Sequence, residues 1–280
     1  MSIRMPKPAV VVLLFFTLFS LTVSSRVAAA TRAEVAPGGG VAEAESVPSN
    51  ERPLPGGMAT DGRVWYVPMA RKEIALTFDD GPYPFYTPLL LHQLEADATP
   101  ATFFLVGRTI QEYPELVERI IASGDEIGNH TYNHFVLTGM SESEIEDQIE
   151  ACGSLIARYT GAEPTLFRPP HGRYDTRVVE IAARMGYRTI LWNDAPNDAP
   201  VDNSDVPVDE IVQRVLEHAK PGGIILLHNG QYSTIEAIPT IVSALRTQGY
   251  SFVTVSRLLA DQEIEAPERS AEPGLTATRR

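Results

Sequence analysis

The 280-residue sequence contains very little cysteine, because Cys152 is the only one. A single thiol excludes an intramolecular disulfide, and it also excludes a structural zinc site built from several thiolates. Cys152 lies beside Leu155 and Ile156 in a helical pattern, and we expect it to be a small core residue. Stability must therefore come mainly from an apolar core, for which a hydrophobic content of 44% is ample.

Basic residues are also scarce, with 23 Lys and Arg against 36 Asp and Glu, for a net charge of −13. Such a surface argues against nucleic acid and anionic lipid as partners, and nothing points to a lipid substrate. The balance suits a soluble exported protein. No pattern suggests an obligate interface, so a monomer is expected.

Only one apolar run approaches the length of a membrane span, and it lies at the amino terminus. Arg4 and Lys7 precede an apolar stretch from Pro8 to about Val23, and small residues ending at Ala30 follow. This order predicts a secretory signal peptide over residues 1–30. The alternative is an uncleaved membrane anchor. Either reading predicts a secreted or cell-envelope protein, and cleavage would leave 20 basic against 36 acidic residues.

Apolar periodicity is missing from two further segments. Residues 31–62 are rich in Ala, Gly, Pro, Glu and Ser, which predicts a flexible linker, and residues 261–280 form a polar tail. Neither segment contains a tandem repeat. The remaining segment, residues 63–260, is predicted to be one folded domain.

That domain alternates short apolar runs with amphipathic stretches. Strands are predicted at 74–78, 101–106, 126–129, 165–168, 188–192, 223–228 and 251–255, and helices at 87–96, 109–123, 142–159, 175–185, 207–219 and 235–248. The alternation predicts an α/β fold with a parallel sheet, either a barrel or an open doubly wound sheet. About 200 residues is short for a complete eightfold barrel. We therefore expect an incomplete (β/α) barrel of about seven parallel strands.

Unusual polar residues follow five of these strands, where parallel α/β folds place their chemistry. Asp79 and Asp80 end the first strand and precede a Gly-Pro turn. Successive strand side chains diverge, so one carboxylate could bind a cation while the other handles a proton. The other polar groups are His130 to His134, Arg168 to Tyr174, Asp194 with Asp198, and His228 with Asn229.

His130 and His134 are spaced i and i+4, which on one helical turn would put both imidazoles on a single face. Together with Asp80 they make two imidazoles and one carboxylate. Three protein ligands with an open position are typical of a catalytic zinc site, although cobalt, iron and other divalent metals also accept such ligands.

Four ordered motifs, at 77–82, 130–134, 168–174 and 226–229, resemble the polysaccharide deacetylases, the NodB-homology carbohydrate esterases of family 4. The resemblance covers about residues 72–260. It implies a distorted, incomplete barrel and metal-dependent removal of acetyl groups from N-acetylated sugars. By position, it implies that Asp79 is the general base and that Asp80, His130 and His134 bind the metal. It also implies that Arg168 holds Asp79, that His228 is the general acid, and that the backbone N–H of His171 helps bind the oxyanion.

The resemblance further suggests that Trp192 and Leu226 line a slot for the acetyl methyl group, and Tyr174 is a candidate sugar contact. The alternative for Trp192 and Leu226 is ordinary core packing, and the alternative for Tyr174 is an exposed loop position.

The sequence departs from the family after Trp192, where an Asp and an Asp-Trp pair are common. Here those positions hold Ala195, Asp198 and Ala199. Asp198 keeps the place of the carboxylate that pairs with the catalytic histidine, and Asp194 is an alternative partner if the loop is rebuilt. The missing tryptophan puts sugar stacking there in doubt. His171 also stands where a tyrosine is frequent in the family, but the donor proposed there is the backbone.

The expected function is hydrolysis of N-acetyl groups on an N-acetylhexosamine polymer, peptidoglycan or chitin-like, with a divalent metal that is most simply Zn²⁺. Two alternatives remain at this stage. One is an O-acetyl esterase acting on acetylated xylan with the same site. The other is a non-catalytic glycan-binding envelope protein that keeps the fold.

Overall fold

The computed structural model describes residues 56–199 and 206–265. The predicted signal peptide and most of the predicted linker lie outside the described residues. Within them, no helix is long and apolar enough to cross a membrane.

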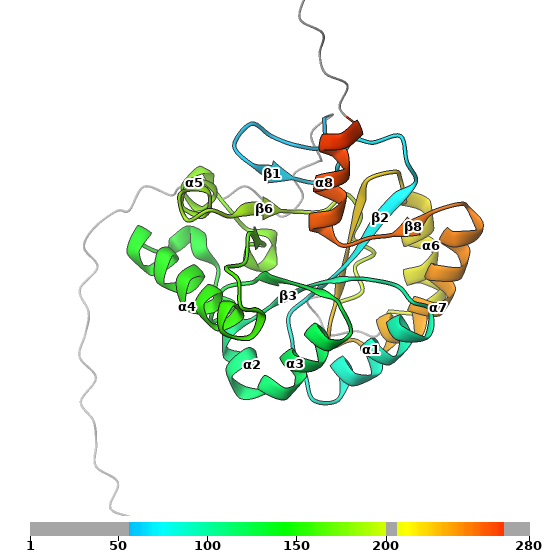
Figure 1. Ribbon diagram of the computed structural model, residues 1–280, viewed down its shortest axis with the longest axis horizontal. Helices are drawn as coiled ribbons and strands as arrows, with labels where there is room; N and C mark the ends of the chain where they lie inside the picture. Colours follow the sequence, from blue (N-terminus) through cyan, green and yellow to red (C-terminus); the bar gives the residue numbers. More distant parts are fainter. Residues whose placement is uncertain (1–55, 200–205, 266–280) are drawn as a thin grey trace, which may run out of the picture. The chain divides into compact units, whose positions relative to one another are not determined.

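The domain is built on a curled sheet of parallel strands with helices packed around it (Figure 1). The strands, in sheet order, are β1 (Arg63–Val64), β6 (Arg188–Ile190), β5 (Leu166–Phe167), β4 (Glu126–Asn129), β3 (Thr102–Leu105), β2 (Glu73–Asp79) and β7 (Gly223–His228), with β8 (Ser251–Phe252) paired to the start of β2. All ladders between these strands are parallel. The predicted incomplete barrel is therefore confirmed, and its seven predicted strands are all present.

The segment after β6 brings the sheet close to closure. Asp194 forms a parallel bridge with Ile225, and the Leu226 N–H donates to the Asp194 carbonyl at 2.9 Å. This contact carries the residues after β6 to the carboxyl end of β7.

The helices follow the strands and cover the sheet. They are α1 (Tyr86–Ala96), α2 (Gly107–Glu112), α3 (Pro114–Ala122), α4 (Glu142–Thr160), α5 (Thr176–Arg184), α6 (Val208–His218), α7 (Tyr232–Thr247) and α8 (Val255–Glu265), with 3₁₀ turns at Leu137–Gly139 and Pro170–Gly172. Helix α4 shows why the sequence predicts its bounds well. Ser141 and Glu144 form a capping box at its start, and Gly161 adopts a left-handed conformation (φ 76°) at its end.

Four of the predicted bounds need correction. The single helix predicted over 109–123 is two helices, because Pro114 has no N–H to continue α2 and instead begins α3. The last predicted strand ends early, and Val255 begins α8. That helix crosses the predicted start of the polar tail, and Asp261 is buried and accepts from Arg257 Nε at 2.7 Å. At the other end, Met58 bridges to Val64, so the predicted linker ends before this residue.

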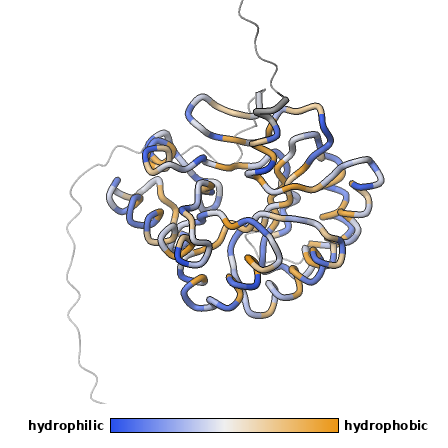
Figure 2. The backbone as a smooth tube through the Cα atoms, in the orientation of Figure 1, coloured by the Kyte–Doolittle hydropathy of each residue, from blue (hydrophilic) through white to orange (hydrophobic). Residues whose placement is uncertain are grey.

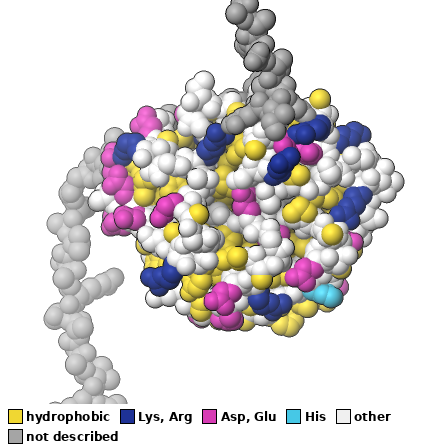
Figure 3. All heavy atoms as spheres, in the orientation of Figure 1, with side chains coloured by type: hydrophobic (Ala, Val, Ile, Leu, Met, Phe, Trp, Pro, Cys, Tyr) yellow, Lys and Arg dark blue, Asp and Glu magenta, His cyan; other side chains and the backbone are white. Residues whose placement is uncertain are grey.

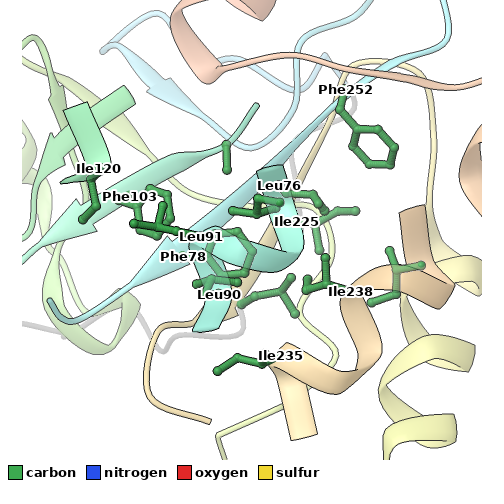
Figure 4. Close-up of a cluster of buried hydrophobic side chains, with 14 of the residues drawn as sticks. Leu76, Phe78, Leu90, Leu91, Phe103, Ile120, Ile225, Ile235, Ile238 and Phe252 are labelled. Atoms are coloured by element: carbon green, nitrogen blue, oxygen red, sulfur yellow. The ribbon is translucent and has the colours of Figure 1, made fainter. Parts of the chain in front are cut away.

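The core lies between the sheet and its helices. Figure 2 shows hydrophobic backbone positions concentrated on the strands, and the close-up in Figure 4 shows strand side chains such as Leu76 and Ile225 meeting helix side chains such as Leu90 and Ile238. Cys152 is fully buried in this core, as expected, and burial raises the pKa of its thiol to about 12. Acidic and basic side chains are interspersed on the face drawn in Figure 3.

Candidate active site

A cleft of about 950 Å³ opens at the carboxyl ends of the strands. Its lining comes from the loops after five strands: Asp79, Asp80, His130, His134, Val136, His171, Gly172, Arg173, Trp192, Ala195, Asn197, Asp198, Ala199, Leu226, His228 and Gln231. Most of the polar residues singled out in the sequence therefore meet in one place. They meet because parallel strands end at one edge of the sheet.

Asp79 is buried at the end of β2 and is held by Arg168, which is fully buried after β5. Arg168 Nη1 donates to Asp79 Oδ1 at 2.6 Å and to Thr77 Oγ1 at 2.8 Å. The rest of the guanidinium donates to the carbonyls of Ile190 and Leu191. The buried cation is thus paired, and each of its three nitrogens donates a hydrogen bond. It fixes one oxygen of Asp79, while Oδ2 faces His130 Nε2 at 3.7 Å.

Asp80, His130 and His134 each offer one ligand atom, and these atoms lie within 4.8 Å of one another. His134 Nε2 is 3.2 Å and His130 Nε2 is 3.8 Å from Asp80 Oδ1. The i, i+4 spacing suggested one helical turn, but the two imidazoles do not lie on one. Residues 130–136 form an irregular loop in which Thr131 (φ 65°) and His134 (φ 60°) are left-handed, and this conformation brings the ring centroids to 4.9 Å.

The donor set fits a divalent metal ion. The Arg168 carbonyl lies 2.8 Å from His130 Nδ1, which directs the lone pair of Nε2 towards Asp80. Burial lowers the pKa of His130, and burial followed by the neighbouring His171 lowers the pKa of His134 to about 4. Both rings are therefore neutral near pH 7, which is the state in which imidazole ligates a metal.

His228 lies at the end of β7 and is paired with Asp198. Its Nδ1 is 2.8 Å from Asp198 Oδ1, and its backbone N–H donates to Oδ2 at the same distance. Thr234 also donates to Oδ2, at 2.6 Å. Burial alone would lower the pKa of His228, but the hydrogen bond and charge of Asp198 outweigh burial and raise it to about 9.

Asp194 is not the partner of His228, so that alternative is wrong. Its side chain is buried outside the cleft lining, and its Oδ1 is 4.0 Å from His218 Nδ1. Its Oδ2 has no hydrogen-bond partner. Burial raises the pKa of Asp194 to about 7.

Trp192 and Leu226 both line the cleft, where a slot for a small acyl group is predicted. Gly172 lies directly against the indole, because a Cβ built on it would stand 2.5 Å from Trp192 Cη2. His171 also lines the cleft, with its ring centroid 4.6 Å from that of His134. The roles predicted for these residues stay predictions.

Tyr174 does not lie where a sugar contact was predicted. Its side chain is buried in a second core cluster and lies outside the cleft lining. Arg63 stacks over its ring at 5.4 Å, and Arg63 Nη1 contacts its hydroxyl at 3.5 Å. Tyr174 packs in the same cluster as Val178 and Val179 of α5, which is why it is not exposed.

Two residues of the site were given no role from the sequence. Thr77 shares a strand face with Asp79 and accepts from Arg168, and the period of two along β2 could have indicated this. Thr234 lies in the first turn of α7, and nothing in its sequence context points to Asp198.

The chain is similar to known proteins over most of the described residues. The family model described as polysaccharide deacetylase matches residues 66–190. A peptidoglycan-N-acetylglucosamine deacetylase of Bacillus cereus is 41% identical over 198 residues, covering 70% of this chain and 92% of that protein. The crystal structure of the Bc1960 peptidoglycan N-acetylglucosamine deacetylase is similar with a TM-score of 0.67 and 33% identity, over 70% of this chain and 92% of that one. A family 4 pseudoenzyme from Bacillus anthracis has the same TM-score at 30% identity, over 72% of this chain and 70% of that one.

Proposed function

Because the chain belongs to the polysaccharide deacetylase family, we propose that it is a metal-dependent hydrolase that releases acetate from the N-acetylhexosamine units of peptidoglycan. The observation that carries the proposal is the convergence of a candidate metal triad, a buried Asp–Arg pair and a His–Asp pair on one cleft. N-acetylglucosamine is the favoured unit, since two of the relatives described above are named as deacetylases of it.

Asp80, His130 and His134 would hold the ion, which we propose to be zinc. A bound divalent cation supplies Lewis-acid polarisation of the acetyl oxygen and makes the attacking water more acidic. The remaining chemistry belongs to side chains that do not ligate the ion.

Asp79 would take the proton of the attacking water. Its Oδ1 is occupied by Arg168, so Oδ2, on the side of His130, is the oxygen available as the base. The clamp on Oδ1 keeps the carboxylate in this orientation through the reaction.

His228 would protonate the leaving amine of the sugar. With a pKa of about 9 it carries a proton at neutral pH, and Asp198 fixes the ring through Nδ1 so that Nε2 is the donating atom. The backbone N–H of His171 is proposed to bind the developing oxyanion, and Trp192 with Leu226 to surround the acetyl methyl group.

The amino-terminal pattern of residues 1–30 supports export to the cell envelope, where peptidoglycan is accessible. Export is part of the proposal.

The test is acetate release by the full chain, loaded with zinc, from peptidoglycan, an N-acetylglucosamine oligomer and acetylxylan side by side. Release from the first two and loss of release on chelation are expected. Preferential release from acetylxylan would assign O-acetyl esterase activity instead, and no release from any of the three would refute the proposal.

A further inference from the structure

The described residues include only four exposed large hydrophobic side chains: Phe85, Leu89, Phe135 and Tyr232. Three of them are aromatic, with exposed fractions of 64% for Phe85, 51% for Phe135 and 54% for Tyr232. Single exposed apolar side chains are common, but exposed aromatic rings beside a cleft are candidates for a binding surface.

All three residues lie on, or directly after, loops that also supply the cleft. Phe85 follows the Asp79–Asp80 segment and directly precedes α1. Phe135 stands between His134 and Val136, both of which line the cleft. Tyr232 follows Gln231, another lining residue, and begins α7. The three residues therefore lie next to cleft-lining segments that follow β4, β2 and β7, which belong to one stretch of the sheet.

The loops that carry Phe85 and Tyr232 are joined to each other. Asn229 donates its backbone N–H to the Asp79 carbonyl and exchanges side-chain hydrogen bonds with Thr87. Tyr83 packs on Gly230, where a Cβ would meet its ring at 3.0 Å. These contacts hold the two loops together as one part of the rim.

The ring of Phe85 is also held in place from behind. It makes a T-shaped contact with Tyr86, with centroids 5.4 Å apart, and Tyr86 packs against the main core cluster. An exposed ring that is anchored in this way can offer a flat apolar surface with little loss of entropy on binding. Ala195 and Ala199, by contrast, offer no ring at the wall of the cleft that they line.

We propose that Phe85, Tyr232 and Phe135 form stacking subsites for the sugars on either side of the unit being deacetylated. The ligand class is a stretch of glycan polymer, whose pyranose rings present apolar C–H faces that pack on aromatic rings. The proposal rests on the deacetylase function proposed above and adds that the enzyme selects a chain rather than an isolated sugar. The three aromatic rings would supply the sugar stacking that Ala195 and Ala199 cannot provide.

The test measures kcat/KM for acetate release from short and long N-acetylglucosamine oligomers. For the wild type, kcat/KM is expected to rise with chain length. Phe85→Ala and Tyr232→Ala are each expected to lower the value for long oligomers about five- to tenfold, and to leave the value for the shortest substrate unchanged. Phe85→Tyr and Tyr232→Phe, which keep the rings, should retain the wild-type dependence on length.

Tyr159→Ala is the control away from the rim, because this ring lies near the carboxyl end of α4 and packs partly against the core. Acetate release that does not depend on length, or is unaffected in both alanine variants, would overturn the stacking proposal and leave the deacetylase function intact. If no substrate releases acetate, the deacetylase function fails.

In that case, retardation of the protein in native gels that contain soluble glycan tests stacking by itself. Loss of retardation in the alanine variants would support stacking, and unchanged retardation would overturn it.

Discussion

Arg168 donates a 2.6 Å hydrogen bond to Asp79, and neither side chain has appreciable contact with solvent. The pair joins β2 to β5 at the floor of the cleft. The geometry gives the two oxygens of Asp79 different tasks, because the oxygen held by the arginine is the weaker base and Oδ2 is left to accept the proton. The first prediction follows from this division.

Replacing Arg168 should damage both stability and catalysis. Arg168→Gln leaves Asp79 buried beside a neutral partner, which should lower the free energy of unfolding by about 3–5 kcal/mol. Arg168→Lys keeps the charge, but its single ammonium cannot serve Thr77, Asp79 and two carbonyls together. Urea unfolding and acetate release measure the two effects. Wild-type stability in Arg168→Gln would contradict the assigned role.

Asp79→Asn should separate chemistry from metal binding. The amide keeps the size and one acceptor but cannot take a proton, so kcat should fall by about 10²- to 10⁴-fold. The metal content of the purified variant, measured by elemental analysis, should equal that of the wild type. A variant that loses its metal would instead make Asp79 a ligand.

The metal triad can be tested without any turnover. Asp80→Asn is the informative variant, since asparagine tolerates the left-handed backbone found there (φ 67°) while it removes the charge. Added zinc should raise the melting temperature of the wild type and raise it much less in this variant. His218→Ala is the matched control, because that histidine is exposed and outside the triad. An equal zinc response in Asp80→Asn would exclude Asp80 as a ligand.

The pH dependence of activity should report on His228. Its raised pKa means that the acid form is present below about pH 9, so activity should fall as the pH rises through that value. Asp198→Asn removes the carboxylate that raises this pKa, and the alkaline limit should move to lower pH. Because the pKa of His228 is higher in the folded protein than in the unfolded chain, protonation of the ring also stabilises the fold. This stabilisation is complete below the pKa of the unfolded imidazole, and it is lost as the pH rises through about 9. An unchanged alkaline limit in Asp198→Asn would assign it to another group.

Asp194 should make the protein less stable in alkali. Its pKa is raised to about 7, so its stabilising contribution is present in acid and is lost as the pH rises through 7. Asp194→Asn should therefore reduce the difference in unfolding free energy between pH 5 and pH 8, by up to about 3 kcal/mol. Chemical denaturation at the two pH values measures it. If the difference in Asp194→Asn is as large as in the wild type, other groups cause the pH dependence of the unfolding free energy.

The acyl slot can be probed through Gly172. A methyl group there would stand 2.5 Å from the indole of Trp192, so Gly172→Ala should displace the ring and lower kcat/KM. Gly161→Ala is the matched control, because Gly161 has a similar positive φ (76° against 63°) but nothing within 4 Å of the added methyl. Both variants should lose about 1 kcal/mol of stability from backbone strain, and only the first should lose activity.

Much of the architecture could be predicted from the sequence, because it depends on local patterns. Alternating apolar strands and amphipathic helices indicated the incomplete barrel, and polar residues after successive strands indicated which edge carries the site. The capping box at Ser141 and the glycine at 161 determine α4 in the same local way. The break at Pro114 was also readable, since proline cannot continue α2.

Other features were decided by tertiary contacts alone. The two histidines of the triad meet through left-handed backbone at Thr131 and His134, which the spacing of the residues does not reveal. The partner of His228 is Asp198 rather than Asp194, because the Asp194 backbone pairs with β7 while its side chain is buried towards α6. Tyr174 lies in the core although its neighbours line the cleft. The sequence by itself determined the fold class and the donor types of the site. The choice among chemically equivalent side chains depended on loop conformation, which is set by packing between segments far apart in the chain.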